Sequence, residues 1–350
     1  MPLISSDSFQ TSVRHNKIDP VYFLFGEEDL LIEEGLELLV EKAVDPSTRS
    51  FNYDLLHGSE TTWPDLVERV SAYPLMAERR VVVVKDIDRL VAMRGKLDTN
   101  APFLRYLEAP ASTTVLVMTA PTGDFMTKGK AKAPFNTFID RATSVQYKKI
   151  YDRELPSWTS DRIKSRGKEI TPEAVELFVG YSGSSLRVIN NEIEKLFTFV
   201  EDRKRITVED VRSVVGTSKL YNVFELQKAI GARNLELSVE ISERMLRAGE
   251  PEQLILTMLS RYFTILWRLV ELRSTSRDRT EMARAVGISP FFLDEYLGAL
   301  GRYPLAHLQN AFEALLNADV TLKTSNTPVA TVMQMMLVGI IRGESLVAVR

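Results

Sequence analysis

Short apolar runs alternate with helix signals through the first 150 residues. Five runs have the length and the β-branched or aromatic content of strands. They lie at residues 21–25, 51–56, 80–84, 113–119 and, more weakly, 144–147. The run RVVVV at residues 80–84 has no polar alternation, which is typical of a strand covered on both faces. Thr62 and Pro64 form a helix start between two of the runs. Strands separated by helices predict a parallel, doubly wound sheet in an α/β domain at residues 1–148.

The middle segment, residues 149–215, has a helical pattern in which the strand signals stop. Thr171 and Pro172 read as an N-cap and a first helical position, and Gly183 breaks the chain after them. Thr207 and Asp210 have the spacing of a capping box, with Asp in place of the usual Glu. We expect a small three-helix unit here.

The last segment, residues 216–350, is helical and larger. Wide apolar stripes at residues 254–270 and 308–316 predict helices that bury one face against other helices. The pattern alone does not separate positions in the core of this unit from positions that contact another protein. The predicted fold class is therefore α/β plus all-α, in three domains.

Composition narrows the function classes. The 350 residues fit two or three domains. The chain has 44 basic and 47 acidic side chains, which excludes a uniformly basic nucleic-acid-binding protein but allows a local basic patch. The absence of cysteine excludes disulfides, thiolate nucleophiles and cysteine zinc sites. His15, His57 and His307 lie far apart, so no metal centre built on histidines is expected. Without a secretory signal or a run of 18 apolar residues, we expect a soluble, cytoplasmic protein with no membrane contact.

The turn after the first strand is unsuited to phosphate. Doubly wound sheets bind phosphates at their strand ends, and a P-loop needs G-x-x-x-x-G-K-[ST] there. This chain reads Gly26-Glu27-Glu28-Asp29 instead, with seven acidic and no basic residues from Gly26 to Glu41. Acidic side chains repel a triphosphate and no lysine offsets them. We interpret the domain as a nucleotide-type fold without nucleotide binding.

A second glycine-rich segment, residues 123–130, comes close to a P-loop. Its spacing is one residue too long, and Ala131 stands where Ser or Thr would bind magnesium. It also follows the fourth strand rather than the first. We interpret it as a surface loop. Lys128, Lys130 and Lys132 could touch DNA phosphates there, although a solvated charge run is the simpler interpretation.

Asp86 and Asp88 follow the strongest strand, where carboxylates of nucleotide hydrolases hold magnesium. The neighbouring Lys85 and the missing P-loop favour a polar strand end instead. No Ser-His-Asp or Cys-His arrangement stands within a recognisable motif. We therefore expect no catalytic, nucleotide-binding or metal site, and no cofactor.

The segment at residues 71–77, SAYPLMA, is apolar although it lies between a helix and the valine strand. Such a loop either packs inward or offers an apolar tip to a partner. Its chemistry favours inward packing, although Tyr and Met are enriched at binding surfaces. Both interpretations stay open on the residues alone.

Five segments in order resemble the delta subunit family of the bacterial DNA polymerase III clamp loader. They are YFLFGEEDLLIEEGLELL, SGSSLRVINNEIEKL, NVFELQKAIGARN, RAGEPEQLILTMLSRYF and LLNADVTLKTS, at residues 22–39, 182–196, 222–234, 247–263 and 315–325. No single motif is diagnostic, but the five together span almost the whole chain.

The resemblance implies three domains: a degenerate AAA+ nucleotide-fold domain (1–148), a helical lid (149–215) and a helical collar for oligomerisation (216–350). Delta-like subunits bind and open the sliding clamp, the beta subunit, without hydrolysing ATP. In the family an apolar tip before the third strand enters a pocket on the clamp. That position here is Tyr73-Pro74-Leu75-Met76, where Tyr73 and Pro74 depart from the common Met-x-Leu-Phe form. The resemblance thus favours partner binding for this segment.

The implied partners are the gamma/tau ATPase subunits, delta-prime and, through the whole assembly, primer-template DNA. Three alternatives remain. An active AAA+ ATPase would bind nucleotide. A DNA-repair or helicase-like factor would bind primer-template alone with a steep salt dependence. A scaffold without clamp contact would be indifferent to Leu75 and Met76.

Overall fold

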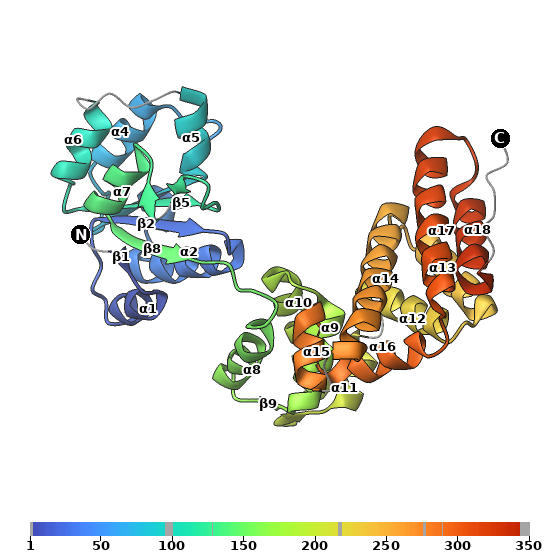
Figure 1. Ribbon diagram of the computed structural model, residues 1–350. Helices are drawn as coiled ribbons and strands as arrows, with labels where there is room; N and C mark the ends of the chain where they lie inside the picture. Colours follow the sequence, from blue (N-terminus) through green and yellow to red (C-terminus); the bar gives the residue numbers. More distant parts are fainter. Residues whose placement is uncertain are drawn as a thin grey trace. The chain divides into compact units, whose positions relative to one another are not determined.

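The computed structural model describes residues 3–94, 101–127, 129–215, 219–275, 278–288 and 290–343. The chain forms two compact units, Met1–Ile150 and Tyr151–Arg350 (Figure 1). The boundary between the two units, after Ile150, lies close to residue 148, the predicted end of the α/β domain. The second unit holds both the predicted lid and the predicted collar.

The first unit is built on one six-stranded parallel sheet. In spatial order its strands are β1 (Leu3–Ile4), β8 (Thr143–Tyr147), β2 (Val21–Gly26), β5 (Thr114–Ala120), β4 (Arg80–Lys85) and β3 (Tyr53–His57). All five predicted strands are present. The two-residue β1 was not predicted, since so short an edge strand has no periodicity to detect. The second predicted strand begins at Tyr53 rather than residue 51, because Phe51 and Asn52 belong to the short helix α3 (Arg49–Asn52).

Helices cover both faces of the sheet (Figure 1). One face packs on α1 (Ser6–Arg14) and α2 (Asp29–Ala43). The other packs on α4 (Trp63–Ser71), α5 (Ile87–Arg94), α6 (Pro102–Glu108) and α7 (Phe135–Arg141). Alternate valines of β4 enter the two cores, and all four are fully buried. Each contributes about 1.5–3 kcal/mol by leaving water, which explains the run without polar alternation.

The second unit begins with four helices in its described part up to residue 215: α8 (Leu155–Ser165), α9 (Pro172–Ser182), α10 (Leu186–Val200) and α11 (Val208–Val215). The three-helix prediction missed α8. Leu155 and Ile163 are the buried apolar residues of this helix, too few to give a clear apolar stripe. Two two-residue strands, β9 (Glu169–Ile170) and β10 (Arg205–Ile206), pair in parallel. The expectation that strands stop near residue 150 is therefore wrong in this detail.

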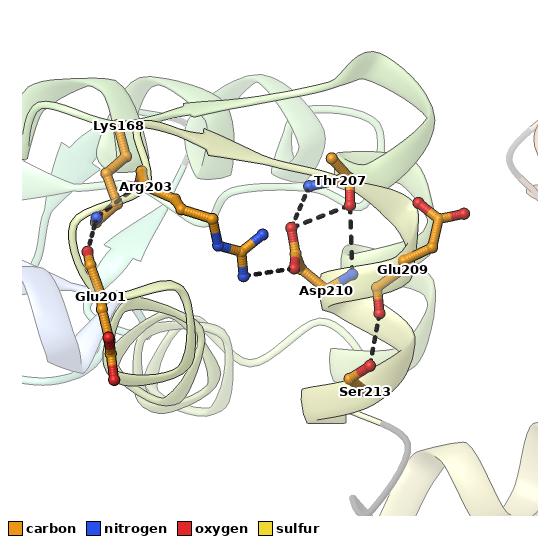
Figure 2. Close-up of polar contacts among 7 residues, drawn as sticks. All are labelled: Lys168, Glu201, Arg203, Thr207, Glu209, Asp210 and Ser213. Atoms are coloured by element: carbon orange, nitrogen blue, oxygen red, sulfur yellow. Dashed lines mark hydrogen bonds and ion pairs between the residues drawn. The ribbon is translucent and has the colours of Figure 1, made fainter.

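A corner of this unit is fixed by polar contacts (Figure 2). The predicted capping box is confirmed, because Thr207 N donates to Asp210 Oδ2 at 2.9 Å and Asp210 N donates to Thr207 Oγ1 at 3.5 Å. Burial raises the pKa of Asp210, but the hydrogen bonds from Arg203 and Thr207 outweigh it and lower that pKa overall. Lys168 Nζ donates to the carbonyl oxygens of Glu201 and Arg203.

The remaining helices share one core. They are α12 (Lys219–Gly231), α13 (Leu235–Arg247), α14 (Glu252–Thr275), α15 (Arg279–Val286), the 3-10 helix η1 (Pro290–Phe292), α16 (Leu293–Leu300), α17 (Leu305–Thr324) and α18 (Val329–Arg342). The predicted stripes on α14 and α17 supply much of this core, with Phe263 and Leu308 fully buried. Leu316 and Val320 of α17 are instead 62% and 47% exposed. The predicted fold class, α/β followed by all-α, is confirmed.

Candidate functional site

The turn after β2 is tied to the neighbouring strand. Gly26 has a φ of 138°, which favours glycine, and the Glu27 N–H donates to the Tyr147 carbonyl at 3.0 Å. A Cβ atom on Gly26 would stand 2.0 Å from the same carbonyl oxygen. The turn therefore lies directly against the end of β8. This contact leaves no room for a side chain at position 26.

The carboxylates at the start of α2 accept hydrogen bonds from backbone N–H groups. The carboxylate of Glu28, 9% exposed, accepts from the Ile150 N–H at 2.8 Å. Burial raises the pKa of Glu28, and the bond from Ile150 offsets part of that rise. The Asp29 side chain accepts from the Leu30 N–H at 2.8 Å. Two carboxylates thus stand at the helix start, where a phosphate would bind, and that of Asp29 accepts from an N–H of the first turn.

The carboxylates after β4 form no metal cage. Asp86 has a φ of 57° and lies 4.0 Å from Arg89. Burial raises the pKa of Asp88, whose Oδ1 has no hydrogen-bond partner. Lys85 pairs with Glu33 at 3.3 Å. Within the described ranges, no group of three or more His, Asp or Glu side chains is placed to hold a metal ion.

The glycine-rich segment after β5 is a short hairpin rather than a plain loop. Strands β6 (Met126–Thr127) and β7 (Lys130–Ala131) pair antiparallel, and Gly129 has a φ of 79°. Lys130 and Lys132 are exposed, while the predicted Lys128 lies outside the described residues. The hairpin directs these lysines to solvent.

The segment Tyr73-Pro74-Leu75-Met76, called the tip below, faces solvent. Tyr73 is 86% exposed, Leu75 54% and Met76 90%, and Pro74 is partly exposed. The inward-packing interpretation is therefore wrong. Three large apolar side chains in four consecutive residues form an exposed patch, unlike the single exposed apolar residues common on protein surfaces.

Local signals place the tip where it is. The Thr62 hydroxyl caps α4 by accepting from the Asp65 N–H at 3.3 Å, as predicted. The helix ends at Ser71, before Pro74, which lacks the N–H that a continuing helix would need. Met76 then takes a φ of 53°. This left-handed conformation costs a non-glycine residue about 1–2 kcal/mol, so neighbouring contacts must hold it.

The contacts that hold the tip come from residues that sequence reasoning missed. The Asn52 side chain accepts from the Leu75 N–H at 2.7 Å and donates to the Leu75 carbonyl at 2.8 Å. The Arg80 guanidinium donates to the Tyr73 carbonyl at 3.5 Å and forms an ion pair with Asp54. No signal in the sequence links positions 52 and 75, since only the pairing of β3 with β4 brings them together.

Strand direction separates the two features. All six strands of the sheet are parallel, so the turn after β2 lies at the carboxyl edge. The tip, a few residues before Arg80 at the start of β4, lies at the amino edge. The turn after β2 thus lies at the carboxyl edge, where nucleotides bind in related sheets, and the exposed apolar tip lies at the amino edge.

A second apolar feature lies in the second unit. It is a hollow of about 330 Å³, lined by Thr264 and Trp267 of α14 and by Gln309 and Phe312 of α17.

Across the described part of the chain, no helix combines the length and the apolar character that crossing a membrane requires.

Comparison with known proteins gives consistent matches. The family models "DNA polymerase III, delta subunit" and "DNA polymerase III delta subunit, C-terminal domain" match residues 22–148 and 221–340. DNA polymerase III subunit delta of Bacillus subtilis is 26% identical over 334 residues, 95% of each chain. A probable DNA polymerase III subunit delta of Aquifex aeolicus is 23% identical over 296 residues, 82% of each chain.

Among solved structures, the Bacillus subtilis DNA clamp loader delta protein matches with a TM-score of 0.61 and 24% identity. The match covers 96% of this chain and 99% of that one. At this identity the likeness concerns the fold alone, an α/β unit followed by helices.

Proposed function

Since the chain belongs to the family of bacterial DNA polymerase III delta subunits, we propose that it binds the sliding clamp through its tip and opens the ring for loading onto primed DNA. The observation that carries the proposal is the tip itself: Leu75 and Met76, 54% and 90% exposed, on a backbone held by buried polar side chains. An apolar anchor entering a pocket is the usual core of a binding hot spot.

The mechanism is mechanical rather than chemical. A wedge that fits its pocket only when the clamp is distorted binds the open ring more tightly than the closed one. This difference in affinity shifts the ring toward the open state, and it sets the upper limit of the shift. No covalent step is required of this chain.

This subunit is proposed to act without hydrolysing ATP. Glu28 and Asp29 fill the helix start after β2 with carboxylates, and both accept hydrogen bonds from backbone N–H groups. A bound triphosphate would place its negative charge against these groups, at a cost that no lysine of the turn offsets. ATP turnover would then belong to the gamma/tau subunits of the assembly.

The proposed division of labour follows the family. Residues 1–148 would bind the clamp, residues 149–215 would form the lid, and residues 216–350 would form the collar that joins the gamma/tau subunits and delta-prime. Primer-template DNA would be held by the whole assembly, in keeping with the net charge of −3 on this chain. The boundary between lid and collar stays a prediction, and residues 216–218 lie outside the described residues.

A calorimetric titration with the sliding clamp of the same organism tests the proposal. We expect the wild type to bind and the Leu75→Ser, Met76→Ser variant to lose about a hundredfold or more in affinity, the range of a hot spot. Both side chains are exposed, so the free energy of unfolding should change by less than about 0.5 kcal/mol.

The matched control is Leu316→Ser, Val320→Ser, which removes two exposed apolar side chains from α17 in the second unit. It should bind the clamp like the wild type. If the wild type does not bind the clamp, or if the tip variant binds equally well, the proposal is wrong. Binding of primer-template by the chain alone, with a steep salt dependence, would instead support the DNA-repair alternative.

A further inference from the structure

We propose that Asn52 is a positioning residue for clamp binding: it fixes the backbone of Leu75 so that the tip is presented in its binding conformation before the clamp arrives. The inference rests on the proposed function, because it concerns how the same tip is held. It adds a residue that lies 23 positions before Leu75 and is 1% exposed, so it cannot itself be a clamp contact.

Asn52 binds the backbone of Leu75 at two points. The Asn52 carboxamide oxygen accepts from the Leu75 N–H at 2.7 Å, and its nitrogen donates to the Leu75 carbonyl at 2.8 Å. The carboxamide thus meets both backbone polar groups of one residue, in the way a neighbouring strand would. Two short bonds to the same residue fix its orientation as well as its place.

Asn52 is itself held firmly. Its nitrogen also donates to the Thr48 carbonyl at 3.3 Å, and its backbone N–H donates to the same oxygen at 3.2 Å. The next residue, Tyr53, pairs with Val81 in the β3–β4 register, so the fixed point belongs to the sheet. This buried amide therefore attaches the tip to the rigid part of the unit, in addition to the contact between Arg80 and the Tyr73 carbonyl.

The tip needs such an anchor. Met76, the next residue, has a φ of 53°, which an exposed segment would leave if nothing held it. Tyr73 and Met76, 86% and 90% exposed, gain little from packing. Holding a binding segment in its bound conformation removes the ordering cost from the binding step, which is the general source of affinity by preorganisation.

The first test compares the clamp affinities of wild type, Asn52→Ala and Asn52→Asp. Alanine removes both bonds, and aspartate keeps an acceptor for the Leu75 N–H but loses the donor to the carbonyl. We expect affinity to fall about tenfold to a hundredfold for alanine, the worth of two hydrogen bonds. Asn310→Ala, which removes a hydrogen bond to the Gly343 carbonyl in the second unit, is the matched control and should bind like wild type.

A double-mutant cycle separates positioning from general destabilisation. If Asn52 acts through the tip, Asn52→Ala should cost much less affinity in a Met76→Ser background than in the wild type. An equal loss in both backgrounds would overturn the inference. So would wild-type affinity in the Asn52 variants while Leu75→Ser, Met76→Ser loses binding, an outcome that would leave the proposed function standing.

A measurement on the wild type alone covers the case in which the Asn52 variants do not fold. The amide of Leu75 should be protected from hydrogen exchange in the free protein, because its N–H is bonded to a buried side chain. Exchange at the rate of an unstructured loop would overturn the inference whatever the variants do. Absence of clamp binding by wild type would overturn both this inference and the proposed function.

Discussion

The turn at Gly26–Asp29 and the tip at residues 73–76 lie at opposite edges of one parallel sheet, and they differ in how their polar and apolar groups are placed. In the turn, backbone and side-chain polar groups satisfy one another: Glu27 bonds to Tyr147 and Glu28 to Ile150. In the tip, the buried side chain of Asn52 bonds the backbone N–H and carbonyl of Leu75, while the apolar side chains are exposed to solvent. The two edges of the sheet therefore differ in chemistry, with polar groups bonded to one another at the carboxyl edge and exposed apolar side chains at the amino edge.

The turn and the tip also differ in backbone strain. The positive φ of Gly26 falls on the one residue type that adopts it freely, whereas that of Met76 falls on a residue that does not. The turn is thus relaxed and structural. At the tip a costly backbone conformation coincides with exposed apolar side chains, which is the arrangement found at binding sites.

The sharpest way to break the turn is Gly26→Ala. The new Cβ would meet the Tyr147 carbonyl oxygen at 2.0 Å, a backbone contact that cannot move aside. We expect the free energy of unfolding to fall by about 3 kcal/mol or more in a denaturant titration. The matched control is Gly123→Ala at the same edge, where the nearest atom is 3.9 Å away and the change should stay within about 0.5 kcal/mol. Equal stability of the two variants would contradict the close contact between Gly26 and the Tyr147 backbone.

At the tip, Met76→Gly should move stability and binding in opposite directions. Glycine accepts a φ of 53° without the steric cost, so the free energy of unfolding should rise, by up to about 1 kcal/mol. Loss of the exposed side chain should weaken clamp binding about tenfold. Denaturant unfolding and calorimetry on the same preparation measure both. A variant that is less stable yet binds normally would refute the idea that strain is stored for binding.

Glu28→Gln should change how the stability of the protein depends on pH. The folded-state pKa of Glu28 is raised by burial, so its ionised form costs stability above that pKa, and the cost fades as the pH falls below it. Glutamine keeps an acceptor for the Ile150 N–H. We expect the variant to be more stable than wild type at pH 8, by less than about 1 kcal/mol. The advantage should be lost below the ordinary carboxyl pKa of about 4.3.

Asp210→Asn supplies the control of opposite sign. The hydrogen bonds of Asp210 lower its pKa, so its contribution is present at neutral pH and is lost as the pH falls through the lowered value. This variant should be less stable than wild type at pH 7. Denaturant titrations of both variants, from pH 8 to well below the ordinary Asp pKa of about 3.9, measure the two slopes, and slopes of the same sign would contradict the assignments.

The smallest expected effect is that of nucleotide. Mg-ATP at 1 mM should leave the melting temperature of the wild type unchanged within about 1 °C, because a ligand stabilises only a fold that binds it. A P-loop ATPase measured in parallel shows that the assay detects binding. A clear rise for this chain would reopen the ATPase alternative.

Local patterns in the sequence carried much of the fold. The caps at Thr62, Thr171 and Thr207 were predictable because each bond spans three residues. The valine strand was predictable because burial on both faces excludes polar alternation. Four of the five segments that resemble the delta subunit family lie within the residues matched by the two family models, and the segment at residues 182–196 lies outside both. In contrast, α8 was missed because few of its positions are buried.

The sequence was sufficient to predict the five longer strands of the sheet, the helix caps at Thr62, Thr171 and Thr207, and the apolar character of residues 73–76. The direction in which the tip faces, and the contacts that hold it, depend on the tertiary structure. The bond between Asn52 and Leu75 depends on the parallel pairing of β3 with β4, across 23 positions of chain. The apolar residues of a segment show that it is more stable out of water. Whether the fold covers that segment depends on the packing of all its neighbours.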